Sequence, residues 1–260
     1  MAVADDRGIQ TTVCQVASGG DDPGAVRLAN NEVHIWTLAL DDRAIRAPVE
    51  ELLSPDERER ASRFRFERHR AQFAVTRATL RRLLASYLSV SPREISFCYS
   101  SHGKPGLSES LLDFNVSHTE GMAVFGFTRG RRIGVDVERI RADFRPHEVA
   151  ERFFSPAERT ALHDLPTGER HAAFFRVWTR KEAYIKARGE GLSHPLDQFD
   201  VSVDDRARLT ATHRDVSEAH RWQLENLSVG PEFAAAAAFE VTVPPSPNRI
   251  QISGLHENVF

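Results

Sequence analysis

The sequence predicts an α+β fold of two similar α/β half-domains, related by a pseudo-twofold axis, with the active site in the cleft between them. Three observations predict it: the length of 260 residues, a set of segments that recurs in one order, and the same succession of helices and strands in each half. A repeat of about 100 residues is too long for a solenoid array and is typical of a duplicated half-domain.

The repeat consists of three pairs of short segments. The first pair shares the pattern S-P-x-E-R, the second a phenylalanine, a valine and Thr-Arg, and the third an Asn-x-Ser triplet followed by an apolar strand. Each match is weak alone, but their common order and nearly constant offset favour duplication over coincidence. In chain order the pairs are Ser54–Arg58 with Ser155–Arg159, Phe73–Arg77 with Phe175–Arg180, and Asn115–Phe127 with Asn226–Phe239.

The repeat also sets the predicted domain boundaries. The first half-domain covers residues 31–132 and the second covers residues 133–243. Residues 1–30 are rich in Gly, Asp and Ala without periodicity, and residues 244–260 begin with a proline cluster. We therefore expect a flexible tail at each end.

The elements of the first half-domain follow from local patterns. Residues Val33–Leu40 alternate between apolar and polar side chains, as a half-buried strand does. Ser54 as N-cap and Pro55 at the first helical position begin a helix. A long amphipathic helix is expected over His69–Leu88. The remaining predicted strands lie around Ile95–Tyr99, Asp113–Val116 and Met122–Phe127.

Composition excludes several classes of protein. Hydrophobic residues make up 41% and charged residues 27%, and the net charge of -3 gives no overall attraction to nucleic acid or anionic membranes. There is no apolar run of about 20 residues and no secretory signal at the N-terminus. We expect a cytoplasmic protein with no membrane or nucleic-acid partner, in which Cys14 and Cys98 are reduced thiols.

The second half-domain begins with a predicted strand that carries two acids. Within Ile133–Glu138, Asp136 and Glu138 are two residues apart, so both side chains lie on the same face of the strand. Two neighbouring carboxylates suit a hard divalent cation such as Mg²⁺. The alternative is an exposed acidic face of a half-buried strand.

A second candidate site lies on the long helix of the second half-domain. Glu182 and Lys186 are four residues apart and share one helical face. The alternative is a surface ion pair, but Trp178 and the apolar residues between the two leave little of this helix free to be solvated. A third carboxylate with Lys181 and Lys186 beside a metal is the mixture that phosphate chemistry needs.

Further candidates lie in the first half-domain. Ser117 and His118 follow a strand, where they either cap the sheet or face the same cleft as the acids. Lys104 lies on a turn before a proline. Arg60 and Arg77 belong to a cationic stretch that is either a solvated helix face or a phosphate contact.

Together these segments resemble one family. The pattern I-G-V-D-x-E followed by W-x-x-K-E-A-x-x-K is similar to the signature of the 4′-phosphopantetheinyl transferases, and G-K-P with F-N-x-S-H indicates the larger, monomeric Sfp-type branch. The resemblance covers about residues 33–240. It implies the duplicated fold of that family. It also implies transfer of 4′-phosphopantetheine from coenzyme A to a serine of an apo acyl or peptidyl carrier protein, giving holo-carrier and 3′,5′-ADP.

The resemblance also implies a role for each candidate residue. The predicted Mg²⁺ ligands are Asp136, Glu138 and Glu182, and the predicted catalytic residues are Glu182, Lys186 and Asp136. Coenzyme A phosphates are assigned to Lys104, Ser117, His118, Lys181 and Lys186, with His118 on the 3′-phosphate. Two family lysines correspond here to Glu57 and Arg60. Arg60 can hold a phosphate and Glu57 cannot, so Arg77 is expected to take the place of the lysine that is missing at position 57.

Two other functions remain open at this point. One is a Mg²⁺-dependent phosphodiester hydrolase that uses the same acids. The other is an inactive pseudoenzyme that only binds nucleotides or carrier proteins. Against a hydrolase, the sequence has no G-x-S-x-G, G-x-x-x-x-G-K-[ST] or H-E-x-x-H motif. Against a pseudoenzyme, the four signature side chains are all present: Asp136, Glu138, Glu182 and Lys186.

Overall fold

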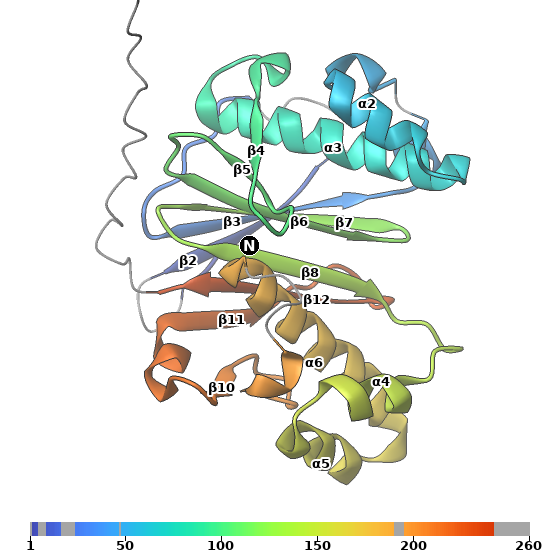
Figure 1. Ribbon diagram of the computed structural model, residues 1–260, viewed down its shortest axis with the longest axis vertical. Coiled ribbons are helices and arrows are strands. Elements are labelled where there is room, and N and C mark those ends of the chain that lie inside the picture. Colours follow the sequence, from blue (N-terminus) through green and yellow to red (C-terminus); the bar gives the residue numbers. More distant parts are fainter. Residues whose placement is uncertain (1, 5–8, 17–23, 47, 190–194, 242–260) are drawn as a thin grey trace, which may run out of the picture.

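The computed structural model describes residues 2–4, 9–16, 24–46, 48–189 and 195–241. Figure 1 shows four layers: the long helix α3 (Glu67–Leu88), a first sheet, a second sheet, and the long helix α6 (Thr167–Arg188). Each helix covers the outer face of one sheet, and the inner faces of the two sheets meet in the middle of the molecule.

The first half contains one sheet and its helices. After β3 (Glu32–Ala39) come the short helix α1 (Asp42–Ile45), the 3₁₀ turn Glu50–Leu52, α2 (Pro55–Ser62) and α3. A 3₁₀ turn at Pro92–Glu94 precedes the hairpin of β4 (Phe97–Tyr99) and β5 (Pro105–Leu107), and then β6 (Leu112–Thr119) and β7 (Met122–Arg129). The antiparallel sheet has the order β3-β7-β6.

The second half repeats this plan. The order of elements is β8 (Ile133–Arg139), α4 (Pro146–Phe153), α5 (Pro156–Asp164), α6, β9 (Phe199–Val201), β10 (Leu209–Thr212), β11 (Trp222–Asn226) and β12 (Phe233–Glu240), with 3₁₀ turns at Leu196–Gln198 and Val216–Arg221. Its antiparallel sheet has the order β8-β12-β11, the counterpart of β3-β7-β6. The predicted duplicated α+β fold is therefore confirmed.

The two S-P-x-E-R segments perform the same local task. In α2 the Ser54 N–H donates to Glu57 Oε2 at 2.9 Å, and in α5 the Ser155 N–H donates to Glu158 Oε2 at 2.9 Å. Both helices therefore begin with a capping box and a proline in the first turn. Each is followed by a helix of 22 residues that ends at a left-handed residue, Ser89 or Gly189.

The expectation of a simple tail over residues 1–30 is wrong. Strands β1 (Ala2–Ala4) and β2 (Gln10–Gln15) extend the first sheet, with β2 parallel to β3. The physical reason is that β3 would otherwise have a free edge, and the three consecutive β-branched residues of QTTVCQ allow this segment to pair with it. Ile9 and Val16, at the ends of β2, are buried. The predicted tail at residues 244–260 lies outside the described residues.

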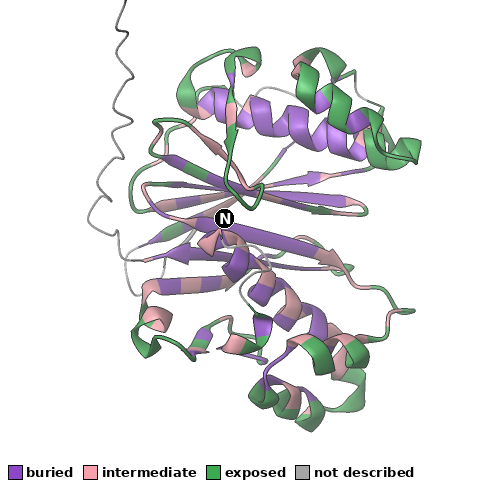
Figure 2. Cartoon of the chain, in the orientation of Figure 1, coloured by how far each residue is buried: buried purple, intermediate pink, exposed green. Residues whose placement is uncertain are grey.

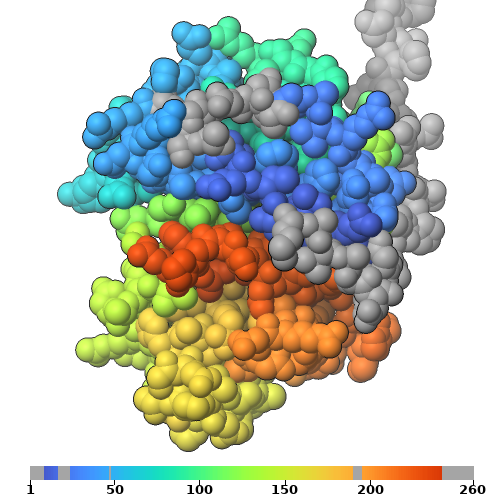
Figure 3. All heavy atoms as spheres, turned by 180° about the vertical axis from the view of Figure 1, so that it is seen from behind, coloured from blue at the N-terminus to red at the C-terminus, as the bar shows by residue number. Residues whose placement is uncertain are grey.

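The two sheets pack directly against each other. Ile133, Val135 and Val137 of β8 contact an apolar cluster that includes Val33 and Val124 of the first sheet. Figure 2 shows the central strands and the inner faces of both long helices as buried, and Figure 3 shows β12 residues lying beside residues of the N-terminal strands. One face of β8 therefore contacts the first half, and its other face is left for α6.

Candidate active site

The close contact between β8 and α6 forms the floor of the candidate site. Gly134, Asp136 and Glu138 alternate with the apolar residues of β8 and face α6. A Cβ at Gly134 would lie 2.1 Å from the Ala183 carbonyl oxygen and 2.3 Å from the Ala187 nitrogen. Only glycine allows the helix backbone so near the strand, and this brings the face of α6 that carries Glu182 and Lys186 over the two acids.

Asp136 is the most buried acid of the site, with 3% exposure. Its Oδ1 accepts hydrogen bonds from Ser117 Oγ at 2.9 Å and from Lys186 Nζ at 2.6 Å. Its Oδ2 is buried and has no hydrogen-bond partner in the part of the chain that the structure describes. Such an oxygen is costly unless a ligand completes its coordination. Lys186 Nζ also donates to Ser117 Oγ at 3.0 Å, so β6, β8 and α6 meet at this carboxylate.

The other two predicted acids are coupled to Asp136 by charge. Burial raises the pKa of Glu138 to about 7, with repulsion from Asp136 and Glu182 adding to the increase and Lys186 and a hydrogen bond with Trp178 opposing it. Burial also raises the pKa of Glu182, and repulsion from Asp136 adds to this. Three carboxylates that repel one another in a partly buried place favour the binding of a cation.

The donor set suits a hard divalent cation whose remaining ligands come from a substrate. Among the described residues, no group of three or more His, Cys, Asp or Glu side chains is arranged so that it could hold a metal ion alone. Mg²⁺, however, is usually held by one or two carboxylates together with substrate phosphates. The unpartnered Oδ2 of Asp136, beside two acids with raised pKa values, fits that mode of binding.

His118 lies beside a hollow of about 370 Å³ in the first half. The hollow is lined by His118 together with Phe64, Arg68, His69, Gln72, Thr119 and Glu120. Loss of hydration lowers the pKa of His118, and the charges of Lys186 and Arg60 lower it further. His118, Arg60 and Lys186 thus share one electrostatic neighbourhood. The buried Nε2 of Gln72 has no hydrogen-bond partner among the described residues, which adds a donor that sequence reasoning missed.

The structure does not support a phosphate-binding role for Lys181. Its side chain is fully buried, and its Nζ donates to Glu158 Oε1 at 2.6 Å and to the Phe199 carbonyl at 2.7 Å. Burial lowers the pKa of this lysine, and the charge of Glu158 opposes the change. Lys181 is therefore a structural cation that joins α6 to α5 and β9.

The same correction applies to Arg77. Its Nε lies 3.1 Å from Glu57 Oε1, and one of its terminal nitrogens donates to Tyr99 Oη at 2.9 Å. Arg81 completes this buried group with its Nε at 2.7 Å from Glu57 Oε2. Glu57 is thus a helix-capping acid that neutralises cations of α3, and it needs no compensation by Arg77. The sequence repeat could have indicated this structural role, because Glu57 matches Glu158 and each acid pairs with a cation of the helix that follows it.

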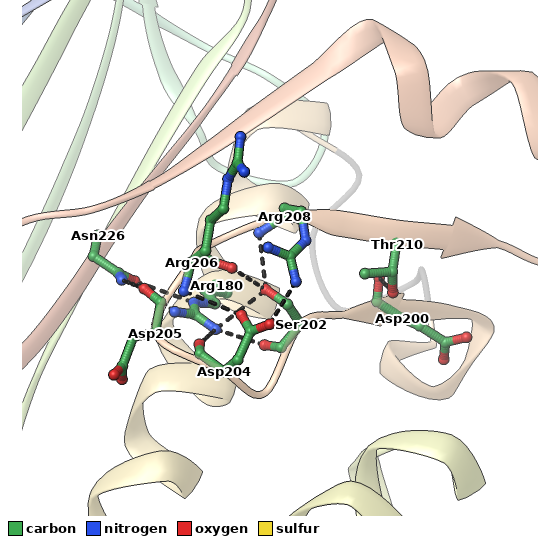
Figure 4. Close-up of polar contacts among 9 residues, drawn as sticks. All are labelled: Arg180, Asp200, Ser202, Asp204, Asp205, Arg206, Arg208, Thr210 and Asn226. Atoms are coloured by element: carbon green, nitrogen blue, oxygen red, sulfur yellow. Dashed lines mark hydrogen bonds and ion pairs between the residues drawn. The ribbon is translucent and has the colours of Figure 1, made fainter. Parts of the chain in front are cut away.

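Arg180, which the repeat also marks, organises the loop before β10. Its guanidinium donates to the carbonyls of Ser202 at 2.6 Å and Asp204 at 2.8 Å, and to Asn226 Oδ1 at 2.9 and 3.1 Å (Figure 4). Asn115, the counterpart of Asn226, accepts a hydrogen bond from the Val135 N–H at 2.8 Å. The repeated Arg and Asn residues are thus structural rather than catalytic.

Lys104 reaches the site from the first half, and among the described residues its Nζ donates only to backbone carbonyls. Its Nζ donates to the Ile133 carbonyl at 3.0 Å and to the Lys186 carbonyl at 2.7 Å. This arrangement differs from the predicted role as a phosphate ligand. Of the predicted residues, Asp136, Ser117 and Lys186 are in direct contact, and Glu138 and Glu182 interact with them electrostatically.

Comparison with known proteins identifies the family. Residues 132–238 match the 4′-phosphopantetheinyl transferase superfamily, and residues 46–126 match the N-terminal domain of 4′-phosphopantetheinyl transferases. The chain is 37% identical to the 4′-phosphopantetheinyl transferase HetI of Nostoc sp., over 83% of this chain and 91% of that protein. It therefore belongs to the 4′-phosphopantetheinyl transferase superfamily.

Two further relatives agree. A putative 4′-phosphopantetheinyl transferase of Synechocystis sp. is 32% identical, over 74% of this chain and 78% of that protein. The 4′-phosphopantetheinyl transferase Sfp of Bacillus subtilis is 31% identical, over 61% of this chain and 70% of that protein. In the part of the chain that the structure describes, no helix has the length and apolar character to cross a membrane.

Proposed function

We propose that this protein transfers the 4′-phosphopantetheine group of coenzyme A to a serine of an apo acyl or peptidyl carrier protein, releasing 3′,5′-ADP. The observation that carries the proposal is the meeting of Asp136 with Lys186, beside Glu138 and Glu182, in a member of this superfamily. One chain supplies both halves of the site, so we propose that it acts as a monomer, in the cytoplasm.

The metal of the proposed reaction is Mg²⁺, held by Asp136, Glu138 and Glu182 together with the diphosphate of coenzyme A. Bound there, Mg²⁺ would supply charge neutralisation at the phosphate that is attacked and at the phosphate that departs. The support is the unpartnered Oδ2 of Asp136 and the raised pKa values of the two glutamates. Burial is the larger cause of these raised pKa values, and a nearby cation would offset the repulsion that adds to it.

The chemical step needs a proton acceptor and a cation. The serine oxygen forms a bond to the β-phosphorus, the bond from that phosphorus to 3′,5′-ADP breaks, and the serine proton passes to Glu182. A carboxylate whose pKa is raised above its usual range is a better base near neutral pH than an ordinary one. Lys186 would neutralise charge on the phosphate, and Arg60, Ser117 and His118 would hold the remaining phosphate groups.

Intact-protein mass spectrometry tests the proposal. Apo acyl and peptidyl carrier proteins are incubated with the protein, coenzyme A and Mg²⁺, and 3′,5′-ADP is measured in the same samples. We expect a phosphopantetheine adduct on the carrier and an equal amount of 3′,5′-ADP. Asp136→Ala and Glu182→Ala should each lower the rate by about 10²-fold or more, the scale of losing one transition-state stabiliser.

The same experiment separates the alternatives. A Mg²⁺-dependent hydrolase would release nucleotide without modifying the carrier, and an inactive pseudoenzyme would do neither. Near-normal transfer by both variants would refute the assignment of the acids. Wild-type protein that modifies none of the carriers would refute the proposed function.

A further inference from the structure

The turn between β4 and β5 carries one lysine from the first half to the crossing of β8 and α6. The turn is tightly bonded: the Gly103 N–H donates to the Ser100 carbonyl at 2.9 Å, and the Ser100 N–H donates to the Lys104 carbonyl at 2.9 Å. The Lys104 N–H donates to Ser100 Oγ at 3.1 Å. Gly103 has a φ of 77°, which glycine adopts without strain. The base of the Lys104 side chain is therefore fixed.

The ammonium of Lys104 joins the two backbones that form the floor of the site. Its Nζ donates to the Ile133 carbonyl at the start of β8 and to the Lys186 carbonyl in the last turn of α6. Carbonyls in the last turn of a helix have no partner within the helix, and a cation there also interacts favourably with the helix dipole. Lys104 thus satisfies an acceptor at the end of α6.

These two carbonyls flank the closest approach of the helix to the strand. Ile133 precedes Gly134, and Lys186 precedes Ala187, whose nitrogen would lie 2.3 Å from a Cβ at Gly134. The side chain of Lys186 in turn reaches Asp136 Oδ1 at 2.6 Å. One lysine therefore fixes the backbone of Lys186, and Lys186 contacts the central acid.

From this geometry we propose that Lys104 is a positioning residue for the transferase reaction, which holds the end of α6 against β8 and so keeps the Lys186 ammonium at Asp136. This inference rests on the proposed function. Two of the three ammonium protons of Lys104 are already used by backbone carbonyls, so its charge serves the helix end rather than a phosphate.

The surroundings of Lys104 support a structural use of its charge. Burial lowers its pKa to about 8, Asp113 opposes the change, and Arg132 adds to it. Burial raises the pKa of Asp113 to about 6, Lys104 and Arg132 oppose this change, and Glu240 adds to it. An ammonium kept in so poorly hydrated a place is stabilised by the carbonyls that it contacts.

Steady-state kinetics of Lys104→Met test the proposal against the role of phosphate ligand. We expect kcat to fall at least 10-fold, while the KM for coenzyme A changes less than 2-fold. Dephospho-coenzyme A, which lacks the 3′-phosphate, should show the same loss of kcat. The matched control is His102→Ala in the same turn, which should keep kcat within 2-fold. A rise in KM with unchanged kcat would overturn the proposal, as would a loss seen only with coenzyme A.

Hydrogen exchange gives a second readout that needs no catalysis. In Lys104→Met, the amides of residues 185–189 at the end of α6 should exchange at least 10-fold faster than in the wild type. Residues 85–89 at the end of α3 occupy the matching place in the first half and should not change. Unchanged exchange at residues 185–189 would overturn the proposal. Because this readout does not depend on transfer, failure of the proposed function would leave it interpretable.

Discussion

Replacing Gly134 with alanine tests the crossing of α6 over β8. The new Cβ would lie 2.1 Å from the Ala183 carbonyl oxygen and 2.3 Å from the Ala187 nitrogen. Both are backbone atoms of a helix, so neither can move aside alone, and the whole helix must shift by about 1 Å. We expect a loss of about 3–5 kcal/mol in the free energy of unfolding, a large part of the 5–15 kcal/mol of a typical domain.

Two other glycines provide graded controls. A Cβ at Gly126 would lie 2.7 Å from Val135 Cγ1 and 2.8 Å from Ile133 Cδ1, which are side-chain atoms that can rotate. Gly126→Ala should therefore cost about 1–3 kcal/mol. A Cβ at Gly168, in the first turn of α6, would meet no atom of the described residues within 4 Å. Gly168→Ala should be neutral or stabilising by up to about 1 kcal/mol.

Urea unfolding, followed by circular dichroism and by the fluorescence of the three tryptophans, measures the series. From most to least stable, the predicted order of the variants is Gly168→Ala, Gly126→Ala and Gly134→Ala. The transfer rate should follow the same order, because a displaced α6 separates Lys186 from Asp136. A Gly134→Ala protein within about 1 kcal/mol of the wild type would refute the proposed contact between the backbones.

Two further predictions concern charge. Glu138→Gln should stabilise the metal-free protein by about 2 kcal/mol at pH 8, because the pKa of Glu138 is raised to about 7 and its ionised form is costly in the folded state. The gain should shrink as the pH falls from 7 to 4.5 and vanish below that, and thermal melts in EDTA that show an equal gain at pH 4 would contradict this. We also propose that the exposed Arg141, which lies over Phe144 beyond the end of β8, contacts the carrier protein. Arg141→Glu should raise the carrier KM several-fold without affecting the KM for coenzyme A, and an unchanged carrier KM would refute this contact.

The sequence was most informative where a pattern depends on local geometry. Alternation along β8 predicted that Asp136 and Glu138 share a face, and helical spacing predicted that Glu182 and Lys186 do the same. The duplication was visible in short segments because each copy of S-P-x-E-R performs the same capping task.

The wrong predictions concern side chains whose partners are distant in the sequence. Arg77 and Lys181 carry the charge that a phosphate needs, but each is buried against an acid about 20 residues away that caps the preceding helix. The sequence shows that a residue is charged, but it does not show which distant residue pairs with that charge in the fold. The N-terminal strands were missed for a related reason, since the strand that pairs with β2 is β3, which lies further along the chain.

Electron paramagnetic resonance of Mn²⁺, used in place of Mg²⁺, tests most directly whether the three acids form a metal site with the substrate. We predict weak binding by the protein alone, and one ion per chain held tightly when coenzyme A is present. Asp136→Ala should abolish the tight binding. Tight binding that is indifferent both to coenzyme A and to the loss of Asp136 would contradict a metal shared between these acids and the diphosphate.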